Sequence, residues 1–521
     1  MIVHRIVVAI GLFFLLSAPS GGVAAAAAPA AIDRDLVNIA GAEEPHTPPA
    51  LNRALAFRYR REGAPPPRTV LVLIPGLNSG PNTFDILARA LIAGFGPGLE
   101  IWAVAPRSTL LQDRRGIDAA LAYQNPDFAL GYYYGSLEID GQTFHRIRGT
   151  DVPFVAYWGL DVHLRDVRAV VEEIKARYPG VAIVLGGHSL GGIFAAAYAG
   201  YDFARHPGGD SAAPPAAPDV GARDLAGLFF LDGLPVRIPL RLSPEQYLHG
   251  FRVPVVGRIP GVDSLTASDP RRRVGAFTQS SYLARTSDSI VLDVVAAYAY
   301  LRPGDASYFP FYPRRGLAIT NEALVAAIFS DQIQPDLFVR AAVETPVGNF
   351  KRGPDPFYIN PRGLLDLKSG VPVPGARLIY LPAGDRSPDV RVHLRQLLTA
   401  ILQPGGDFTE WYFPWRVILD LALAAGLDTS DPFASRYISL THVAETNLPM
   451  LIVGAGHGLI RSPRQTEFYR SRVATPPDQV DLHIIPGYSH LDVENADPNP
   501  VVALTLAWLK AMPHHESNLN Q

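Results

Sequence analysis

A series of short, continuous apolar runs constrains the fold of this chain more than any other feature. Residues 69–74 read Thr-Val-Leu-Val-Leu-Ile and are closed by Pro75-Gly76. A run of this length and composition is typical of a strand that is buried on both faces, as in a parallel sheet. The other runs of this kind are residues 99–104, 181–185, 225–231, 450–453 and 480–485.

Between these runs, apolar residues recur every three to four positions, as they do on one face of a helix. The clearest case is the stretch from Leu160 to Tyr178, which Pro179-Gly180 ends. Similar stretches are residues 84–92, 463–472 and 501–512. Because strands alternate with helices, the predicted fold class is α/β, with a mostly parallel central sheet flanked by helices.

Composition excludes several classes of function. The chain of 521 residues is 48% hydrophobic and 18% charged, which is enough to bury a large core. A net charge of −3 argues against a general nucleic-acid binder, which needs a basic face. The chain has no cysteine, so disulfides, thiolate nucleophiles and Cys-ligated metal sites are excluded. Acidic residues form no cluster with metal-ligand spacing, and neither a metal nor another cofactor is expected.

The N-terminus has the pattern of a secretory signal peptide. His4 and Arg5 precede an apolar run over residues 6–18, and small residues follow over 19–31. The apolar run is shorter than the roughly 20 residues that a membrane span requires. We expect a signal peptide over residues 1–28, cleaved within 24–28, and a secreted or periplasmic protein. The alternative is that this segment is retained as an anchor.

The strand and helix patterns divide the rest of the chain. Residues 29–65 are rich in proline and alanine with little pattern, and we interpret them as an N-terminal leader. The α/β core then occupies residues 66–235 and resumes over 447–513, before a tail at 514–521. Between the two parts, residues 236–446 are rich in proline and aromatics and form a large insertion. A smaller insertion within 107–157 contains Asp140-Gly141, a typical hairpin turn.

The strongest local motif follows the third apolar run and reads Gly187-His188-Ser189-Leu190-Gly191. The bare G-x-S-x-G pattern is weak, because chance supplies about 0.2 matches in a chain of this composition. Here the serine follows an apolar strand and opens a helix of small residues, which is the context of a nucleophile elbow. The alternative is a glycine-rich strand–helix turn with an incidental serine.

With this motif in its context, the sequence resembles the α/β-hydrolase superfamily over residues 66–235 and 447–513. The resemblance makes Ser189 the nucleophile and implies that the backbone N–H of Leu190 is one donor of the oxyanion hole. The second donor lies in the turn after the strand at 69–74, which makes Leu77 the candidate. The family often has His-Gly in this turn, whereas this chain has Pro75-Gly76.

The resemblance places the catalytic histidine after the last strand, where residues 486–492 contain His490. A neutral imidazole near pH 7 can accept the serine proton and return it to the leaving group. The other histidines fit less well. His188 occupies the variable position of the elbow, where we expect a structural packing role, and His483 lies inside a predicted strand. His457 is expected to be a structural loop histidine, with contact to substrate as the alternative.

The acid is harder to assign. Many relatives carry it after the strand before the histidine strand, but residues 453–458 contain no carboxylate. Some members place it one strand earlier, which offers Asp232 after the run at 225–231. The rival is Asp385, which also follows an apolar run and would require the insertion to contribute a strand to the core. The acid would fix the imidazole tautomer and stabilise the imidazolium.

In this family, an insertion after the Asp232 strand forms a cap over the active site. We expect the 236–446 insertion to be a large, mainly helical cap. Its many aromatic residues, among them Tyr247, Phe277, Trp411 and Tyr412, are expected mostly to form the cap's own core, and a few to line an apolar pocket.

The resemblance therefore implies an exported serine esterase or lipase with a Ser189–His490–Asp232 triad. A hydrophobic small molecule or lipid ester is the expected substrate, with transient contact to a lipid surface and no nucleic-acid partner. Two alternatives stay open: a peptidase or amidase on the same fold, and a catalytically inactive binding protein. The sequence gives no indication of the oligomeric state.

Overall fold

A computed structural model of the chain describes most of its length. The described residues are 31–206, 217–237, 241–253, 257–269, 275, 277, 289–309, 318–331, 334, 336–343, 347–350, 376–379 and 390–512. The predicted signal peptide and the C-terminal tail lie outside them.

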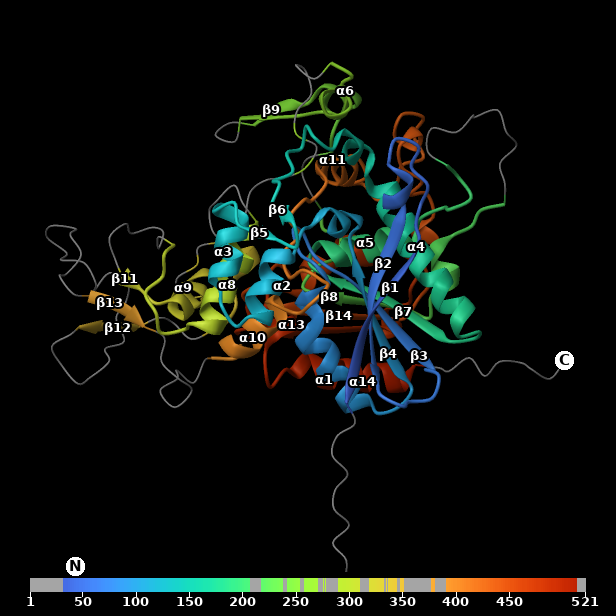
Figure 1. Cartoon of the computed structure of the whole chain (residues 1–521). Helices are drawn as coiled ribbons and strands as arrows, with labels where there is room; N and C mark the ends of the chain where they lie inside the picture. Colours follow the sequence, from blue (N-terminus) through green and yellow to red (C-terminus); the bar gives the residue numbers. More distant parts are fainter. Residues whose placement is uncertain are drawn as a thin grey trace, which may run out of the picture.

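A mixed sheet of eight strands forms the centre of the molecule (Figure 1). In spatial order its strands are β1 (Ile32–Ala40), β2 (Arg53–Arg61), β4 (Leu99–Ala105), β3 (Thr69–Ile74), β7 (Ala182–His188), β8 (Gly227–Leu231), β14 (Met450–Ala455) and β15 (Val480–Ile485). Strands β4 to β15 pair in parallel, whereas β1 pairs antiparallel with β2 and β2 antiparallel with β4. The predicted α/β class and mostly parallel central sheet are confirmed.

The interpretation of residues 29–65 as a leader is wrong, because they contain β1 and β2. The two strands pair over nine residues, from Ile32 opposite Arg61 to Ala40 opposite Arg53. Both strands carry charged residues between their apolar ones, and β1 at the sheet edge is mostly only partly buried, so they lack the continuous apolar runs of the parallel strands. In β2, the alternation of Leu55, Phe57 and Tyr59 was a signal for a strand.

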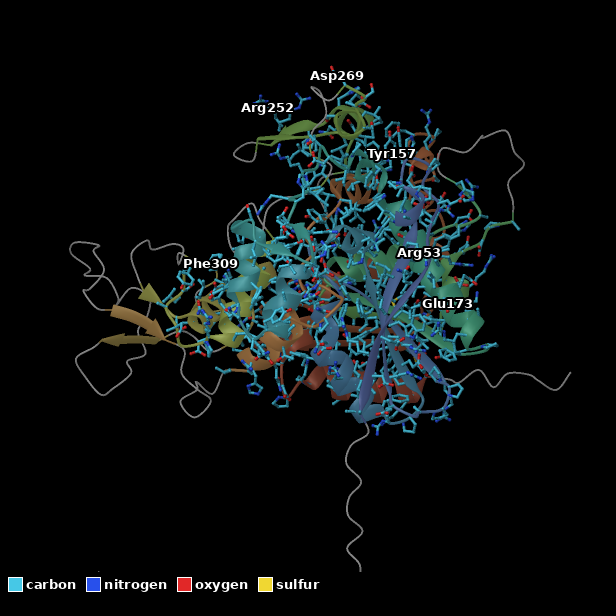
Figure 2. The ribbon with its side chains drawn as sticks, viewed as in Figure 1. Arg53, Tyr157, Glu173, Arg252, Asp269 and Phe309 are labelled. Atoms are coloured by element: carbon cyan, nitrogen blue, oxygen red, sulfur yellow. The ribbon has the colours of Figure 1, made fainter. Side chains whose placement is uncertain are left out.

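Helices cover both faces of this sheet because the strand residues alternate between two apolar cores. Leu71 and Leu73 point into a core with α1 (Asp85–Phe95) and α14 (Pro500–Ala511). Val70 and Val72 point into the other core. That second core contains α4 (Leu160–Arg177) and α5 (Leu190–Ala199). In Figure 2, Glu173 of α4 and Arg53 of β2 lie on the same side of the molecule.

The insertions are mainly helical in their described parts, as predicted for the large one. The first insertion contains α2 (Arg115–Ala122), α3 (Asp127–Tyr134) and the hairpin β5 (Glu138–Ile139) and β6 (Gln142–Thr143). The second contains α6 (Pro244–His249), α7 (Val262–Leu265), α8 (Ile290–Leu301), α9 (Asn321–Phe329), α10 (Leu394–Ile401) and α11 (Trp415–Leu423). Its strands are β9 (Phe251–Val253), β10 (Gly257–Ile259), β11 (Ala318–Ile319), β12 (Val347–Phe350) and β13 (Ala376–Ile379).

The hairpin turn predicted at Asp140-Gly141 is present. Both residues have positive φ angles, 52° and 73°, as a two-residue turn between antiparallel strands requires. The last part of the core adds the short helices α12 (Glu467–Arg470) and α13 (Asp492–Asn495). None of the helices in the described residues has both the length and the apolar character needed to cross a bilayer.

Candidate active site

The three side chains singled out from the sequence lie at one edge of the central sheet. Ser189 follows β7, Asp232 follows β8, and His490 lies five residues after the end of β15. These three strands run parallel within the sheet, so their carboxyl ends meet at the same edge. All three side chains are buried.

Ser189 occupies a strained turn between β7 and α5. Its backbone has φ 56° and ψ −121°, a region that residues with a side chain rarely adopt. The N–H of Ser189 donates to the carbonyl of Leu231 at 2.9 Å, which ties the turn to the end of the neighbouring strand β8. The sharp turn expected from the G-x-S-x-G motif is therefore present.

Asp232 holds the ring of His490 through a short, buried contact. His490 Nδ1 lies 2.6 Å from Asp232 Oδ2. The carboxylate also accepts hydrogen bonds from three backbone N–H groups: Ala455 at 3.0 Å, Leu459 at 2.8 Å and Ile460 at 2.8 Å. Burial alone would raise the pKa of Asp232, but His490 and these backbone donors outweigh it and lower that pKa. An ionised carboxylate therefore faces the imidazole.

The loop after β14 has no carboxylate of its own, but it surrounds the carboxylate of Asp232. A Cβ atom at Gly458 would lie 2.0 Å from Asp232 Oδ2, so only glycine fits this close approach. The rival Asp385 lies outside the described residues. Its preceding strand β13 pairs with β11 and β12 in a separate three-stranded sheet, not with the central sheet. The core strand that the Asp385 alternative requires is absent from the described part of the insertion.

An apolar cavity of about 230 Å³ brings Ser189, His490 and Leu77 together. Its lining residues are Gly76, Leu77, Asn78, Ser79, Thr83, His188, Ser189, Phe338, Val339, Phe408, Thr409, His490 and Leu491. Leu190 lies beside it as the first residue of α5. Within the described residues, Ser189 and His490 face this common space without a hydrogen bond between their side chains.

The sequence did not reveal which insertion residues reach this cavity. Tyr247, Phe277, Trp411 and Tyr412 are buried elsewhere in the insertion, in line with the expectation that most aromatics form its core. Phe338 and Phe408 line the cavity instead. The Phe338 ring lies edge-on to His490 with 6.1 Å between ring centroids. No periodic pattern separates these two phenylalanines from the rest.

A segment of the insertion also holds the turn that carries Leu77. Residues 407–410 run antiparallel to residues 78–82 and exchange three backbone hydrogen bonds with them. The donors are the N–H of Gly80 to Phe408 at 3.0 Å, of Asn82 to Asp407 at 2.9 Å and of Glu410 to Asn78 at 3.0 Å. The insertion thus shapes the turn from which a donor is expected to point at substrate.

The remaining histidines lie in different surroundings. His188 is buried beside His490, with its Nε2 at 3.0 Å from the His490 carbonyl oxygen. The backbone N–H of His457 donates to Tyr488 at 2.8 Å. His483 is partly exposed on β15, with its Nε2 at 2.7 Å from Asp481. In the part of the chain that the structure describes, no group of histidine and acidic side chains could hold a metal ion.

Solved structures with a similar course of the chain include several hydrolases. A proposed lipase from Sulfolobus solfataricus is 14% identical with a TM-score of 0.48, and the match covers 92% of this chain and 95% of that one. A peroxisomal α/β-hydrolase from Saccharomyces cerevisiae is 12% identical with a TM-score of 0.36, over 92% and 88%. An α/β-hydrolase fold protein from Nakamurella multipartita is 13% identical with a TM-score of 0.33, over 92% and 99%.

No protein-family model matches the chain, and no curated protein is significantly similar to it. The chemistry of the site has to be read from its own residues.

Proposed function

We propose that this protein is an exported serine hydrolase that cleaves carboxylic esters with an apolar acyl group. The observation that carries the proposal is the 2.6 Å contact between His490 Nδ1 and Asp232, with the ring and Ser189 facing one apolar cavity. The proposal includes export, because residues 1–28 have the pattern of a signal peptide.

The contact with Asp232 determines which ring nitrogen is the base. Because the carboxylate is ionised, the neutral imidazole carries its proton on Nδ1 and donates it to Asp232. The Nε2 atom is then bare and can accept a proton. As Ser189 Oγ attacks the ester carbonyl carbon, its proton moves to His490 Nε2, and the carbonyl oxygen becomes an oxyanion.

The oxyanion requires fixed donors. In this proposal, they are the backbone N–H groups of Leu77 and Leu190, one from the turn after β3 and one at the positive end of α5. The imidazolium then gives its proton to the departing alcohol, and the acyl group stays on Ser189. Water, deprotonated by the same Nε2, releases the acid and restores the serine.

The lack of a Ser189–His490 hydrogen bond is compatible with this sequence of steps. Catalytic hydrogen bonds are often long or badly aligned in free enzymes and tighten when substrate binds. Phe338, which is half exposed, covers the ring of His490 and lines the cavity. We propose that an apolar acyl chain packs against Phe338 and Phe408 and that this packing brings the reacting groups together.

Labelling with a fluorophosphonate tests the proposal, because this reagent reacts with an activated serine hydroxyl. The expected result is labelling of the wild-type protein, none of Ser189→Ala, and unchanged labelling of Ser471→Ala, a matched change at an exposed serine. A folded wild-type protein without labelling would favour an inactive binding protein. A panel of matched ester and amide substrates separates an esterase from a peptidase or amidase.

A further inference from the structure

Behind His490 lies a second acid–imidazole pair that the proposed mechanism does not use. His188 Nε2 lies 3.0 Å from the carbonyl oxygen of His490, and His188 Nδ1 lies 3.2 Å from Glu494 Oε2. The side chain of His188 is 2% exposed and that of Glu494 is fully buried. The two histidine rings are in contact, with 4.3 Å between centroids and 37° between planes.

Counting protons constrains the charge of this pair. A carbonyl oxygen only accepts hydrogen bonds, so His188 must carry a proton on Nε2 to donate to His490. The other ring nitrogen, Nδ1, then faces a carboxyl oxygen. Two bare acceptors 3.2 Å apart in a buried site would repel each other, so one further proton is required, on either Glu494 or Nδ1, although the two groups are not aligned as a hydrogen bond. In both arrangements the pair carries no net charge.

The surroundings of Glu494 agree with this count. Thr83, a polar neighbour of Glu494, donates its hydroxyl proton to the carbonyl of Gly80 at 3.0 Å. Among the described residues, both carboxyl oxygens of Glu494 are buried without a hydrogen-bond partner, so an ionised carboxylate would be poorly stabilised there. Burial raises the pKa of Glu494 well above its usual value, which favours the protonated acid.

The surroundings of His188 also favour a pair without net charge. Burial and the neighbouring His490 lower the pKa of His188 well below its usual value, against the opposing effect of Asp232. Glu494 faces it from α13. A net positive charge on the pair would destabilise the imidazolium that forms on His490 during the reaction. A net negative charge would stabilise that imidazolium already in the free enzyme, before Ser189 gives up its proton.

We propose that His188 and Glu494 form a positioning pair for His490 and that this pair carries no net charge. The pair holds the backbone carbonyl and one ring face of His490, while Asp232 holds Nδ1. Nε2 is then left facing the cavity with Ser189. The inference rests on the proposed hydrolase function for its kinetic consequences, but the protonation of the pair does not depend on that function.

Four variants of the full chain test the positioning role. His188→Leu removes the donor to the His490 carbonyl, and we expect kcat to fall by about tenfold to a hundredfold with KM changed less than about threefold. His188→Gln keeps an amide donor and should restore part of kcat. Glu494→Gln supplies an N–H to Nδ1 without a charge and should stay within about threefold of wild type, whereas Glu494→Leu should behave like His188→Leu.

The pH profile tests the net charge. The acid limb of kcat/KM reports the ionisation of the general base in the free enzyme. If the pair is neutral, Glu494→Gln leaves this limb within about 0.3 pH units of the wild type. If Glu494 is instead an anion beside a neutral His188, so that the pair carries a net negative charge, its removal destabilises the imidazolium and moves the limb down by more than about 0.5 units, which would overturn the proposal.

Nitrogen NMR of ¹⁵N-histidine-labelled wild-type protein provides a readout that does not require activity. The signals of His188 are those lost in His188→Gln. We expect Nε2 to stay protonated and His188 not to titrate between pH 5 and 9. Titration within this range, or wild-type kcat in His188→Leu, contradicts the pair. Absence of any hydrolysis by the wild type contradicts the proposed function instead and leaves the NMR test intact.

Discussion

Among the buried carboxyl groups near the candidate site, three differ in their hydrogen-bond donors, and these donors decide which of the three is ionised. Asp232 has three backbone donors and the His490 ring, and its pKa is lowered despite burial. Glu410 accepts from the Ser108 hydroxyl, and burial raises its pKa to about 8. For Asp407, with Gln112 and Thr109 as side-chain donors, burial raises the pKa to about 6. At pH 7, burial without sufficient donors therefore leaves Glu410 neutral, whereas Asp407 becomes neutral only below about pH 6.

Asp232→Asn should remove most of the activity while the fold is retained. The amide cannot hold the Nδ1–H tautomer of His490 as a carboxylate does, so we expect kcat to fall by about three to four orders of magnitude. Hydrolysis rates of a chromogenic ester, measured for Asp232→Asn and Asp385→Asn side by side, separate the two acids considered from the sequence. Near-full activity of Asp232→Asn would show that the acid is elsewhere.

Glu410→Gln should remove a loss of stability that accumulates as the pH rises from about 4.5 to about 8. In the unfolded chain this carboxyl ionises near its ordinary pKa of 4.5, whereas in the folded protein it stays protonated up to about pH 8. Unfolding thus releases a proton in this window, and the free energy of unfolding falls as the pH rises through it, by about 1.4 kcal/mol per pH unit. Glutamine should abolish this slope.

Urea unfolding at pH 5 and pH 9 measures the effect. Between pH 5 and pH 9, the difference in unfolding free energy between the variant and the wild type should change by a few kcal/mol in favour of the variant. Glu467→Gln, at an exposed glutamate, is the matched control and should preserve the wild-type slope. An unchanged slope in Glu410→Gln would mean that Glu410 is ionised in the folded protein.

At the scale of elements, the turn after β3 depends on an insertion segment more than 300 residues away in the chain. The antiparallel contact between residues 407–410 and 78–82 fixes the turn on which Leu77 lies. Gly80 is the tightest point, since a Cβ there would lie 2.3 Å from the carbonyl oxygen of Asp407. The insertion is therefore part of the site and not only a cover over it.

Gly80→Ala should displace this turn. We expect a loss of about 1–3 kcal/mol in unfolding free energy and a fall in kcat of about tenfold or more, because the Leu77 N–H moves away from the oxyanion. Gly304→Ala, where a Cβ would meet nothing within 4 Å, is the control. Ester kinetics and thermal unfolding of both variants test this, and wild-type kcat in Gly80→Ala would count against Leu77 as a donor.

The apolar pattern of the sequence predicts the buried elements of the sheet and misses the partly buried ones. The parallel strands were predictable because burial on both faces leaves continuous apolar runs, as in β3 and β7. Strand β1 was not, because most of its residues are only partly buried. Ser189 and His490 could be singled out from the sequence because each lies shortly after the end of a predicted strand. The pairing of His188 with Glu494 does not, because nothing local to either residue encodes a contact across 306 positions.

At the scale of the whole molecule, the insertion and the core share one interior. A single cluster of buried apolar residues contains Val72 and Phe194 of the core together with Val294 and Leu397 of the insertion. A polar contact adds to this: Asp420 of α11 accepts hydrogen bonds from the N–H of Leu160 at 2.9 Å and from the hydroxyl of Tyr247 at 2.6 Å. The boundary drawn at residue 235 from the sequence divides the chain but not its packing.

Because the interior is shared, the insertion and the core should unfold in one transition. Urea unfolding followed by far-ultraviolet circular dichroism and by tryptophan fluorescence should give coincident curves, since Trp411 lies in the insertion and Trp102 in the core. Asp420→Ala leaves the N–H of Leu160 without its acceptor and should lower the free energy of unfolding by about 2–4 kcal/mol. Asp478→Ala, at an exposed aspartate, should change it by less than about 0.5 kcal/mol. Two separated transitions in the wild type would mean that the insertion folds as an independent domain, and the turn at residues 78–82 would then depend on how that domain docks.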